Sequence, residues 1–162
     1  MVLGSYLRTS ESIVDDMIIR SAQSEDVEAL ANLMAELGYP TSSEQMRRRF
    51  KAISGDPSNA TLVAEREGKV LGMVGLRIER SYGSDDSYVQ IRDFVVGSEH
   101  RGKGVGRTLL SAAEDWARRR GARDVMLTTH KRRTDAHRFY RSMGYEATGY
   151  RFYKALYTVP GY

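Results

Sequence analysis

The chain has 162 residues, of which 41% are hydrophobic and 28% are charged, and it contains no cysteine. This composition fits one globular domain with room for a core, and it excludes a disordered chain, disulfides, thiolate metal sites and cysteine nucleophiles. No apolar run approaches the roughly 20 residues of a membrane-spanning helix. The first residues show no secretory signal, so we expect a cytoplasmic protein with no membrane partner.

The net charge is +4, and the basic residues gather in three clusters, at residues 47–49, 118–120 and 131–133. Basic clusters suggest anionic partners, although the first two are more typical of solvated helix faces. The third follows a strand-like run, where a phosphate contact is more plausible. No aromatic residues interleave with these clusters as a single-strand binding surface requires, so we do not expect a nucleic-acid partner.

In chain order, residues 1–16 show no period and are expected to form a loose extension. Ser24 is a helix-start signal, and Thr41 with Glu44 forms a capping box for a second helix. We expect residues 81–87 to form a polar loop, and residues 158–162 a short tail. The expected strands cover residues 17–19, 61–65, 70–78, 88–96, 124–129, 145–148 and 150–156, and two further helices are expected over 105–120 and 134–143.

This order predicts an α/β fold in a single domain over residues 17–157. Its central sheet is mixed and mostly antiparallel, with helices on its faces. The strand at 88–96, the helix after it and the strand at 124–129 form a parallel crossover.

The segment from Arg101 to Gly106 is the strongest functional signal. It places Gly102, Gly104 and Gly106 at the start of a helix, with Lys103 among them. The first amides of a helix have no intrahelical partner, and glycines let a ligand approach the backbone closely. The segment therefore predicts an anion site suited to a pyrophosphate. It matches neither the Walker pattern nor the dinucleotide fingerprint.

The spacing R-x-x-G-x-G resembles the acetyl-CoA loop of the GNAT superfamily of N-acetyltransferases. A second motif, from Phe139 to Tyr145, is similar to that superfamily's (L/F)-Y-x-x-x-G-(F/Y) segment. The resemblance extends over residues 17–156, and it implies an enzyme that takes acetyl-CoA as its acyl donor. Two alternatives remain: a non-catalytic acetyl-CoA-binding module, and a nucleotide-binding protein that uses the same loop.

The resemblance also implies which residues bind the coenzyme. Pantetheine would pair with the backbone of the strand before the loop, and the Val95 amide would donate to the acetyl oxygen. Arg133 stands where the family often has Asn, and it can reach a phosphate instead. The implied coenzyme-binding residues are Phe94, Val95, Val96, Arg101, Gly102, Lys103, Gly104, Val105, Gly106, Arg107 and Arg133.

Acetyl transfer needs an acid for the leaving thiolate and a base for the amine. Tyr140 matches the family tyrosine near the coenzyme sulfur, and a phenol with a pKa near 10 can protonate a thiolate. Asp93 precedes the pantetheine segment and faces opposite to Phe94, which makes it the first candidate base. Glu79, at the end of the strand before, is the second. Each acid is otherwise an ordinary strand-end residue.

The acceptor rests on the C-terminal residues. The runs D-A-H-R-F-Y at 135–140 and R-F-Y-K-A-L at 151–156 look like the branch that contains aminoalkylphosphonate N-acetyltransferases. This resemblance implies a small primary amine that carries an anionic group. Protein or peptide amines and aminoglycosides stay open as acceptors, which would face the first two helices and residues 81–87. The histidines have no metal-ligand spacing, so we expect no metal site. An open sheet can pair at an edge, which makes a homodimer a reasonable expectation.

Overall fold

The structure, a computed structural model, describes residues 15–157. The chain divides into two compact units, one ending at Leu127 and the other beginning at Thr128. Residues 1–14 of the expected extension and the expected tail at 158–162 lie outside the described residues. The single domain over residues 17–157 stays a prediction.

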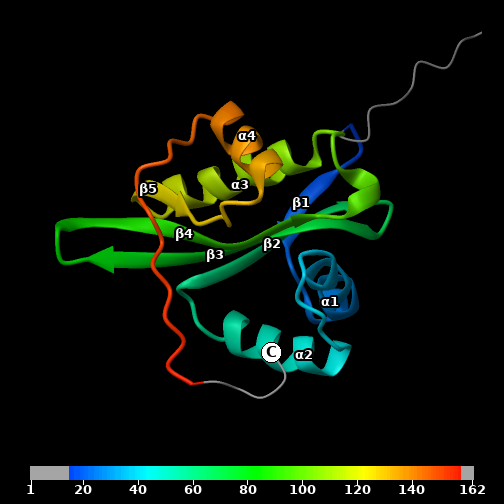
Figure 1. Cartoon of the computed structure of the whole chain (residues 1–162). Coiled ribbons are helices and arrows are strands. Elements are labelled where there is room, and N and C mark those ends of the chain that lie inside the picture. Colours follow the sequence, from blue (N-terminus) through cyan, green and yellow to red (C-terminus); the bar gives the residue numbers. More distant parts are fainter. Residues whose placement is uncertain (1–14, 158–162) are drawn as a thin grey trace, which may run out of the picture. The chain divides into compact units, whose positions relative to one another are not determined.

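The first unit is built on a five-stranded sheet with the order β1-β2-β3-β4-β5 (Figure 1). Its strands are β1 (Ile18–Ser21), β2 (Asn59–Arg66), β3 (Lys69–Ser81), β4 (Ser84–Val96) and β5 (Ala122–Leu127). The first four strands pair antiparallel, and β5 pairs parallel with β4. The predicted mixed, mostly antiparallel sheet with one parallel crossover is therefore confirmed.

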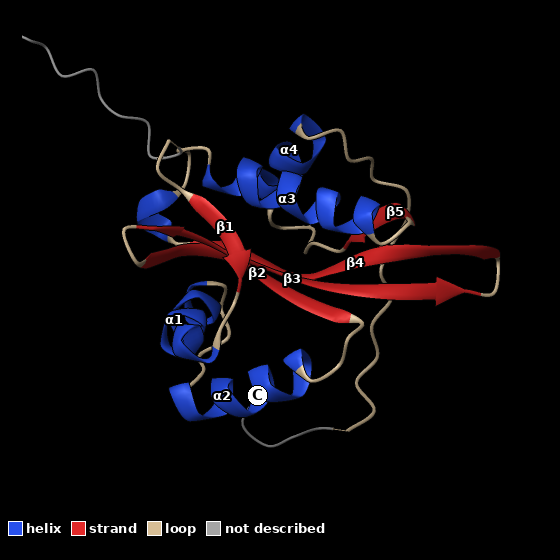
Figure 2. Ribbon diagram, turned by 180° about the vertical axis from the view of Figure 1, so that it is seen from behind, coloured by secondary structure: helices blue, strands red, loops and turns tan. Residues whose placement is uncertain are grey.

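Helices cover both faces of this sheet (Figure 2). The helices α1 (Val27–Glu36) and α2 (Ser43–Ser54) lie on one face, and α3 (Val105–Arg119) lies on the other. Side chains of α1 and α2 form a core with Val63, Met73 and Val95, which occupy one row across β2, β3 and β4. This row identifies the sheet face that α1 and α2 cover, because side chains alternate along a strand.

The starts of the first two helices differ slightly from the predicted ones. A short 3₁₀ helix (Ser24–Asp26) precedes α1, and the buried Asp26 carboxylate binds the Arg20 guanidinium through two bonds of 2.7 and 2.8 Å. In α2 the capping box is formed one residue later than predicted, by Ser42 and Gln45. Adjacent hydroxyl residues, Thr41 and Ser42, make the position of such a cap ambiguous in the sequence.

The loop predicted at residues 81–87 is wrong. Here β3 and β4 continue to Ser81 and Ser84 and are joined by a two-residue turn, Tyr82-Gly83. The strand ends are polar because this part of the hairpin is exposed, and the backbone pairing does not require apolar side chains. By contrast, the strands expected at 61–65 and 70–78 are joined by a tight turn, with Glu67 and Gly68 both in the left-handed region at φ 50° and 75°.

In the described part of the second unit, residues 128–157, the one regular element is α4 (Thr134–Ser142). The strands predicted at 145–148 and 150–156 are absent from the described residues, since 145–155 have no regular secondary structure. Every residue from Glu146 to Tyr157 is exposed. Alternating apolar residues specify a strand only when one face is buried and the backbone is paired, and neither condition holds in this segment.

Candidate active site

The glycine-rich segment forms a turn that leads directly into α3. After Val96, a short 3₁₀ helix (Ser98–His100) turns the chain, and Gly104 is the residue before the first turn of α3. Gly102 and Gly104 have φ angles of +71° and +88°, which side chains rarely tolerate. Gly106 instead lies inside the first helical turn. The segment thus presents the amides at the helix start, where the macrodipole favours an anion.

Arg101, expected among the coenzyme-binding residues, makes contacts to other residues of the protein. Its Nε donates to the Val96 carbonyl at 2.9 Å, and its Nη2 lies 3.3 Å from Glu36 Oε2. The same Glu36 oxygen accepts the Ser98 amide at 2.7 Å. A carboxylate at the end of α1 therefore holds the turn together, and it offsets the charge of Arg101. Lys103 is exposed in the turn, and Arg107 lies in the first turn of α3.

The last residues of β4 extend beyond the end of β5. The β4–β5 pairing runs from Ser87 to Ile91 and stops at Leu127, whereas β3 pairs with β4 as far as Val96. One backbone edge of Phe94–Val96 therefore lies past the end of the neighbouring strand. This is the edge where the family resemblance expects pantetheine, and it ends at the glycine-rich turn.

A β-bulge in β4 determines where Asp93 points. Gly75 pairs with Asp93 and Leu76 pairs with Ile91, so Arg92 is an extra residue in β4. Asp93 consequently shares the α1 and α2 face with Val95, two residues further on, while Ile91 faces α3. Burial raises the pKa of the Asp93 carboxyl, and the charge of Arg92 opposes that rise. The raised pKa suits a residue that exchanges protons nearer to neutral pH.

Asp93 lines a pocket of about 330 Å³ between α2 and the sheet. Thr61, Gly75 and Asp93 form a row across its floor, on β2, β3 and β4. A Cβ atom at Gly75 would lie 3.6 Å from Asp93 Oδ2, so the glycine leaves the carboxylate open to the pocket. The charged lining residues are Arg77, Arg92 and Asp93. The arrangement can bind a small polar molecule beside the candidate base.

Glu79, the second candidate base, does not line this pocket. Its Oε1 lies 3.1 Å from Arg77 Nε, and Asp56 Oδ2 lies 3.0 Å from Arg77 Nη1. Two carboxylates therefore fix the Arg77 guanidinium and offset its charge. Of the two candidate bases, the structure brings only Asp93 to the pocket.

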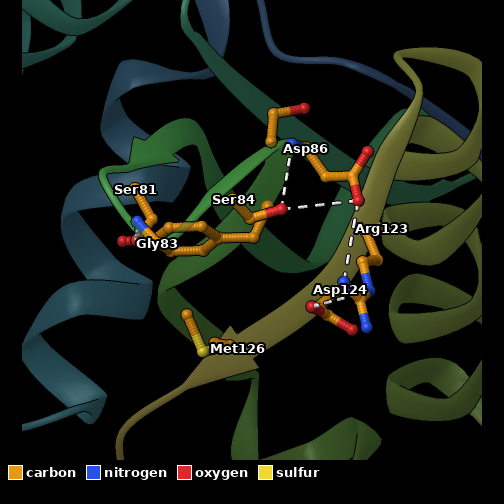
Figure 3. Close-up of a pocket in the computed structure, with 9 residues that line it drawn as sticks. Ser81, Gly83, Ser84, Asp86, Arg123, Asp124 and Met126 are labelled. Carbon is orange, nitrogen blue, oxygen red and sulfur yellow. Dashed lines mark hydrogen bonds and ion pairs between the residues drawn. The ribbon is translucent and has the colours of Figure 1, made fainter.

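A second pocket of about 330 Å³ lies at the other end of the sheet. Figure 3 shows Asp86, Arg123 and Asp124 directed toward one another there, with Arg123 3.7 Å from Asp86 and 3.9 Å from Asp124. It is formed at the amino-terminal ends of β4 and β5, whereas the glycine-rich turn follows the carboxyl end of β4. Residues 81–87, expected to face the acceptor, therefore line a different pocket from Asp93.

Tyr140 lies on α4 in the second unit, and its side chain is buried. Its ring packs edge-on against the Phe139 ring, with the ring centroids 5.4 Å apart, and the centroid of the Tyr145 ring lies 6.0 Å away. Burial raises the pKa of the Tyr140 phenol, and the charge of Arg133 opposes the rise. The phenol is therefore protonated at neutral pH, which is the form that can donate a proton. Arg133 is exposed immediately before α4.

Comparisons with known proteins identify the family of this chain. The sequence model of the acetyltransferase (GNAT) family matches residues 27–145, a range that includes parts of both units. The chain therefore belongs to the GNAT family. It is an enzyme of the N-acetyltransferase class, and the family takes acetyl-CoA as its acyl donor.

Three proteins illustrate the range of similar enzymes. The chain is 34% identical to an aminoalkylphosphonate N-acetyltransferase of Salmonella typhimurium, over 93% of this chain and 98% of that protein. It is 27% identical to an aminoglycoside N(6')-acetyltransferase type 1 of Stenotrophomonas maltophilia, over 80% and 86% of the two chains. A GNAT family acetyltransferase structure from Staphylococcus aureus superposes with a TM-score of 0.77 at 28% identity, covering 87% and 99% of the two chains.

Among residues 15–157, no helix is both long and apolar enough to cross a membrane. Within the same described range, no group of three or more His, Asp or Glu side chains is arranged to hold a metal ion. His137 instead contacts the backbone carbonyl of His130 at 3.1 Å.

Proposed function

We propose that this enzyme acetylates the primary amine of a small molecule that also carries an anionic group, of the aminoalkylphosphonate kind. The observation that carries this proposal is the position of Asp93. It opens into a pocket of small-molecule size and directly precedes Phe94–Val96, where β4 extends past β5. The 34% identity to an aminoalkylphosphonate N-acetyltransferase over most of both chains supports this acceptor.

The acetyl-CoA phosphates bind at the Gly102–Gly106 turn and the start of α3, with Lys103 and Arg107 adding positive charge. The acyl-pantetheine arm lies along Phe94–Val96, and the Val95 amide donates to the thioester oxygen. Arg101 acts indirectly, by fixing the turn through Glu36 and the Val96 carbonyl.

The acceptor amine has a pKa near that of lysine, about 10.4, so it arrives mostly protonated. Asp93 accepts a proton from the ammonium group, directly or through one water. The amine nitrogen then attacks the thioester carbon, a C–N bond forms, and the Val95 amide stabilises the oxyanion. The C–S bond breaks, and the leaving thiolate takes a proton from Tyr140. The attacking nitrogen loses its second proton, which restores the Tyr140 phenol through water, and Asp93 returns the first proton to solvent. The products are the N-acetyl amide and coenzyme A.

An aminoglycoside is the second candidate acceptor, because an aminoglycoside N(6')-acetyltransferase is 27% identical to the chain. Aminoglycosides carry several positive charges and favour acidic sites. The pocket that contains Asp93 also contains Arg92, while the charge of its other arginine, Arg77, is offset by Asp56 and Glu79. With a single carboxylate in its lining and the exposed Arg92 beside it, the pocket suits one amine with a negative group better than a polycation.

A thiol-release assay with a panel of amines tests the proposal. Because the chain contains no cysteine, thiol-reactive dye reports only the coenzyme A that is released. The panel contains aminomethylphosphonate, β-alanine, propylamine, a peptide with a free N-terminus and kanamycin. We expect the highest kcat/KM for aminomethylphosphonate, and a fall of at least about 100-fold in kcat for Tyr140→Phe.

Coenzyme binding without transfer to any amine, together with no effect of Tyr140→Phe, would instead favour a non-catalytic acetyl-CoA-binding module. Stabilisation by ATP and not by acetyl-CoA would favour a nucleotide-binding protein. The homodimer and the cytoplasmic location stay predictions from the sequence.

A further inference from the structure

The pocket that contains Asp93 has an unusual pair of lining residues, because Arg92 and Asp93 are consecutive in β4 and yet both line it. In a regular strand, consecutive side chains point to opposite faces of the sheet. Here the β-bulge inserts Arg92 between the pairs Leu76–Ile91 and Gly75–Asp93. The bulge therefore brings one cation and one carboxylate to the same side.

The two arginines of the pocket differ in what they can bind. Arg77 is held by Asp56 and Glu79, and its Nη1 also donates to Asn59 Oδ1 at 3.2 Å. Arg92 is exposed, and its guanidinium forms no hydrogen bond or ion pair with any of residues 15–157. Arg92 is therefore the lining cation that can bind a ligand without breaking a hydrogen bond or an ion-pair contact to another described residue.

The net charge of the pocket follows from these contacts. The charge of Arg77 is offset by its two carboxylate partners, which leaves Arg92 and Asp93 as one positive and one negative group. A ligand complementary to this pair has one cationic and one anionic end. A pocket of about 330 Å³ limits that ligand to a compact molecule.

We propose that Arg92 and Asp93 select the acceptor by binding its two ends, Arg92 the anionic group and Asp93 the amine. This inference rests on the proposed function. It assigns acceptor specificity to a residue on the bulge of β4 and to a ligand class, compact zwitterionic amines. A phosphonate suits Arg92 best, because a guanidinium binds its oxygens through two parallel hydrogen bonds.

The test compares two small acceptor amines in the wild type and in Arg92→Gln. Aminomethylphosphonate carries an anionic group, and propylamine carries none. We expect the ratio of their kcat/KM values, phosphonate over propylamine, to fall by about 10-fold to 100-fold in Arg92→Gln. Arg92→Lys retains the charge without the bidentate geometry, and we expect its kcat/KM ratio to lie between those of the wild type and Arg92→Gln. β-Alanine distinguishes recognition of a phosphonate from recognition of any anion.

Arg80→Gln is the matched control. Arg80 is exposed on β3, three residues from Arg77, and it does not line the pocket. Arg80→Gln changes the net charge by the same amount as Arg92→Gln. A general electrostatic effect would therefore alter the ratio of kcat/KM values in both variants. An equal change in Arg80→Gln and Arg92→Gln, or no change in Arg92→Gln, would overturn the inference.

A binding measurement separates this inference from the proposed function. Aminomethylphosphonate is titrated calorimetrically into the protein saturated with coenzyme A, which has no acetyl group to transfer. Binding that Arg92→Gln weakens at least about 10-fold supports the inference even where no amine is acetylated, in which case only the proposed function fails. Absence of binding to the wild type, or equal binding to both proteins, overturns the inference.

Discussion

Replacing Glu36 tests whether this carboxylate positions the glycine-rich turn for coenzyme binding. Replacing Glu36 with Ala removes the acceptor of the Ser98 amide and the ion-pair partner of Arg101. Two opposite outcomes follow from two different arguments. If only charge mattered, losing a carboxylate near a phosphate site would strengthen coenzyme binding. If Glu36 positions the turn, losing it weakens binding.

The contacts indicate the size of the effect. The bond to the Ser98 amide is 2.7 Å long, and such a bond contributes about 1 kcal/mol net. The ion pair to Arg101 is exposed, with side-chain exposures of 56% for Arg101 and 37% for Glu36, so it adds only a few tenths of a kcal/mol. A total of about 1 kcal/mol corresponds to about a fivefold weaker coenzyme A affinity.

The assay is calorimetric titration of coenzyme A into wild type, Glu36→Ala and Glu28→Ala. Glu28 is exposed in the same helix, so its replacement matches the change in charge and in helix propensity. We expect the Kd to rise about fivefold only in Glu36→Ala. Adding Arg101→Ala to that variant is expected to weaken binding by less than the sum of the single effects, because the residues share one network. An unchanged or lower Kd in Glu36→Ala would refute the positioning role.

Three further predictions concern the turn, the base and the fold. Gly104→Ala places a side chain at φ +88°, so we expect about 1–2 kcal/mol of strain, a lower Tm and weaker coenzyme A binding, measured by thermal melts and titration. Asp93→Asn should reduce kcat/KM most near neutral pH, where the amine needs a base to remove its proton. The reduction should shrink toward about pH 10, where the amine loses its proton unaided. A pH–rate profile parallel to that of the wild type would exclude Asp93 as the base. Hydrogen bonds from Arg20 hold the pKa of Asp26 below its ordinary 3.8, so the ionised carboxylate stabilises the fold above that pH and loses this contribution as the pH falls through its folded pKa. Asp26→Asn is therefore expected to lower the free energy of unfolding by about 2 kcal/mol at pH 7, in urea titrations, with a deficit that shrinks below pH 3.8; a deficit independent of pH would contradict this account.

The elements that the sequence predicted correctly are those whose signals are local. The glycine-rich segment before α3, the helix at 105–120 and the strands at 61–65 and 70–78 each depend on a few neighbouring residues. The predicted loop at 81–87 failed because exposed strand ends have a polar composition like that of a loop. The strands predicted after residue 144 failed because their pattern needs a buried face and a paired neighbour.

The role of Arg101 shows a different limit. Its position in R-x-x-G-x-G predicted a cation beside phosphates, but Glu36 lies 65 residues earlier in the chain. A motif identifies which side chains are near a site, and it does not identify the partners that other elements supply. The contact with Glu36 exists because α1 ends beside the turn after β4, and this follows from packing of the whole first unit.

The pocket that contains Asp93 shows why the sequence predicts the coenzyme-binding part of the proposed site better than the acceptor-binding part. In the proposed mechanism the donor is bound by backbone, namely the amides at the start of α3 and the edge of Phe94–Val96, so donor binding tolerates any side chains that preserve the turn and the strand. The proposed acceptor site instead uses side chains of β4, whose direction depends on the register of the strand. One extra residue, Arg92, changes that count and moves Ile91 and Asp93 to opposite faces, although their spacing of two predicts a shared face. The bulge is set by pairing with Gly75 and Leu76, which no local pattern around Arg92 encodes. A one-residue change in register at this point would therefore exchange the acceptor site while leaving the coenzyme site intact, and relatives with the same donor can differ in their acceptors.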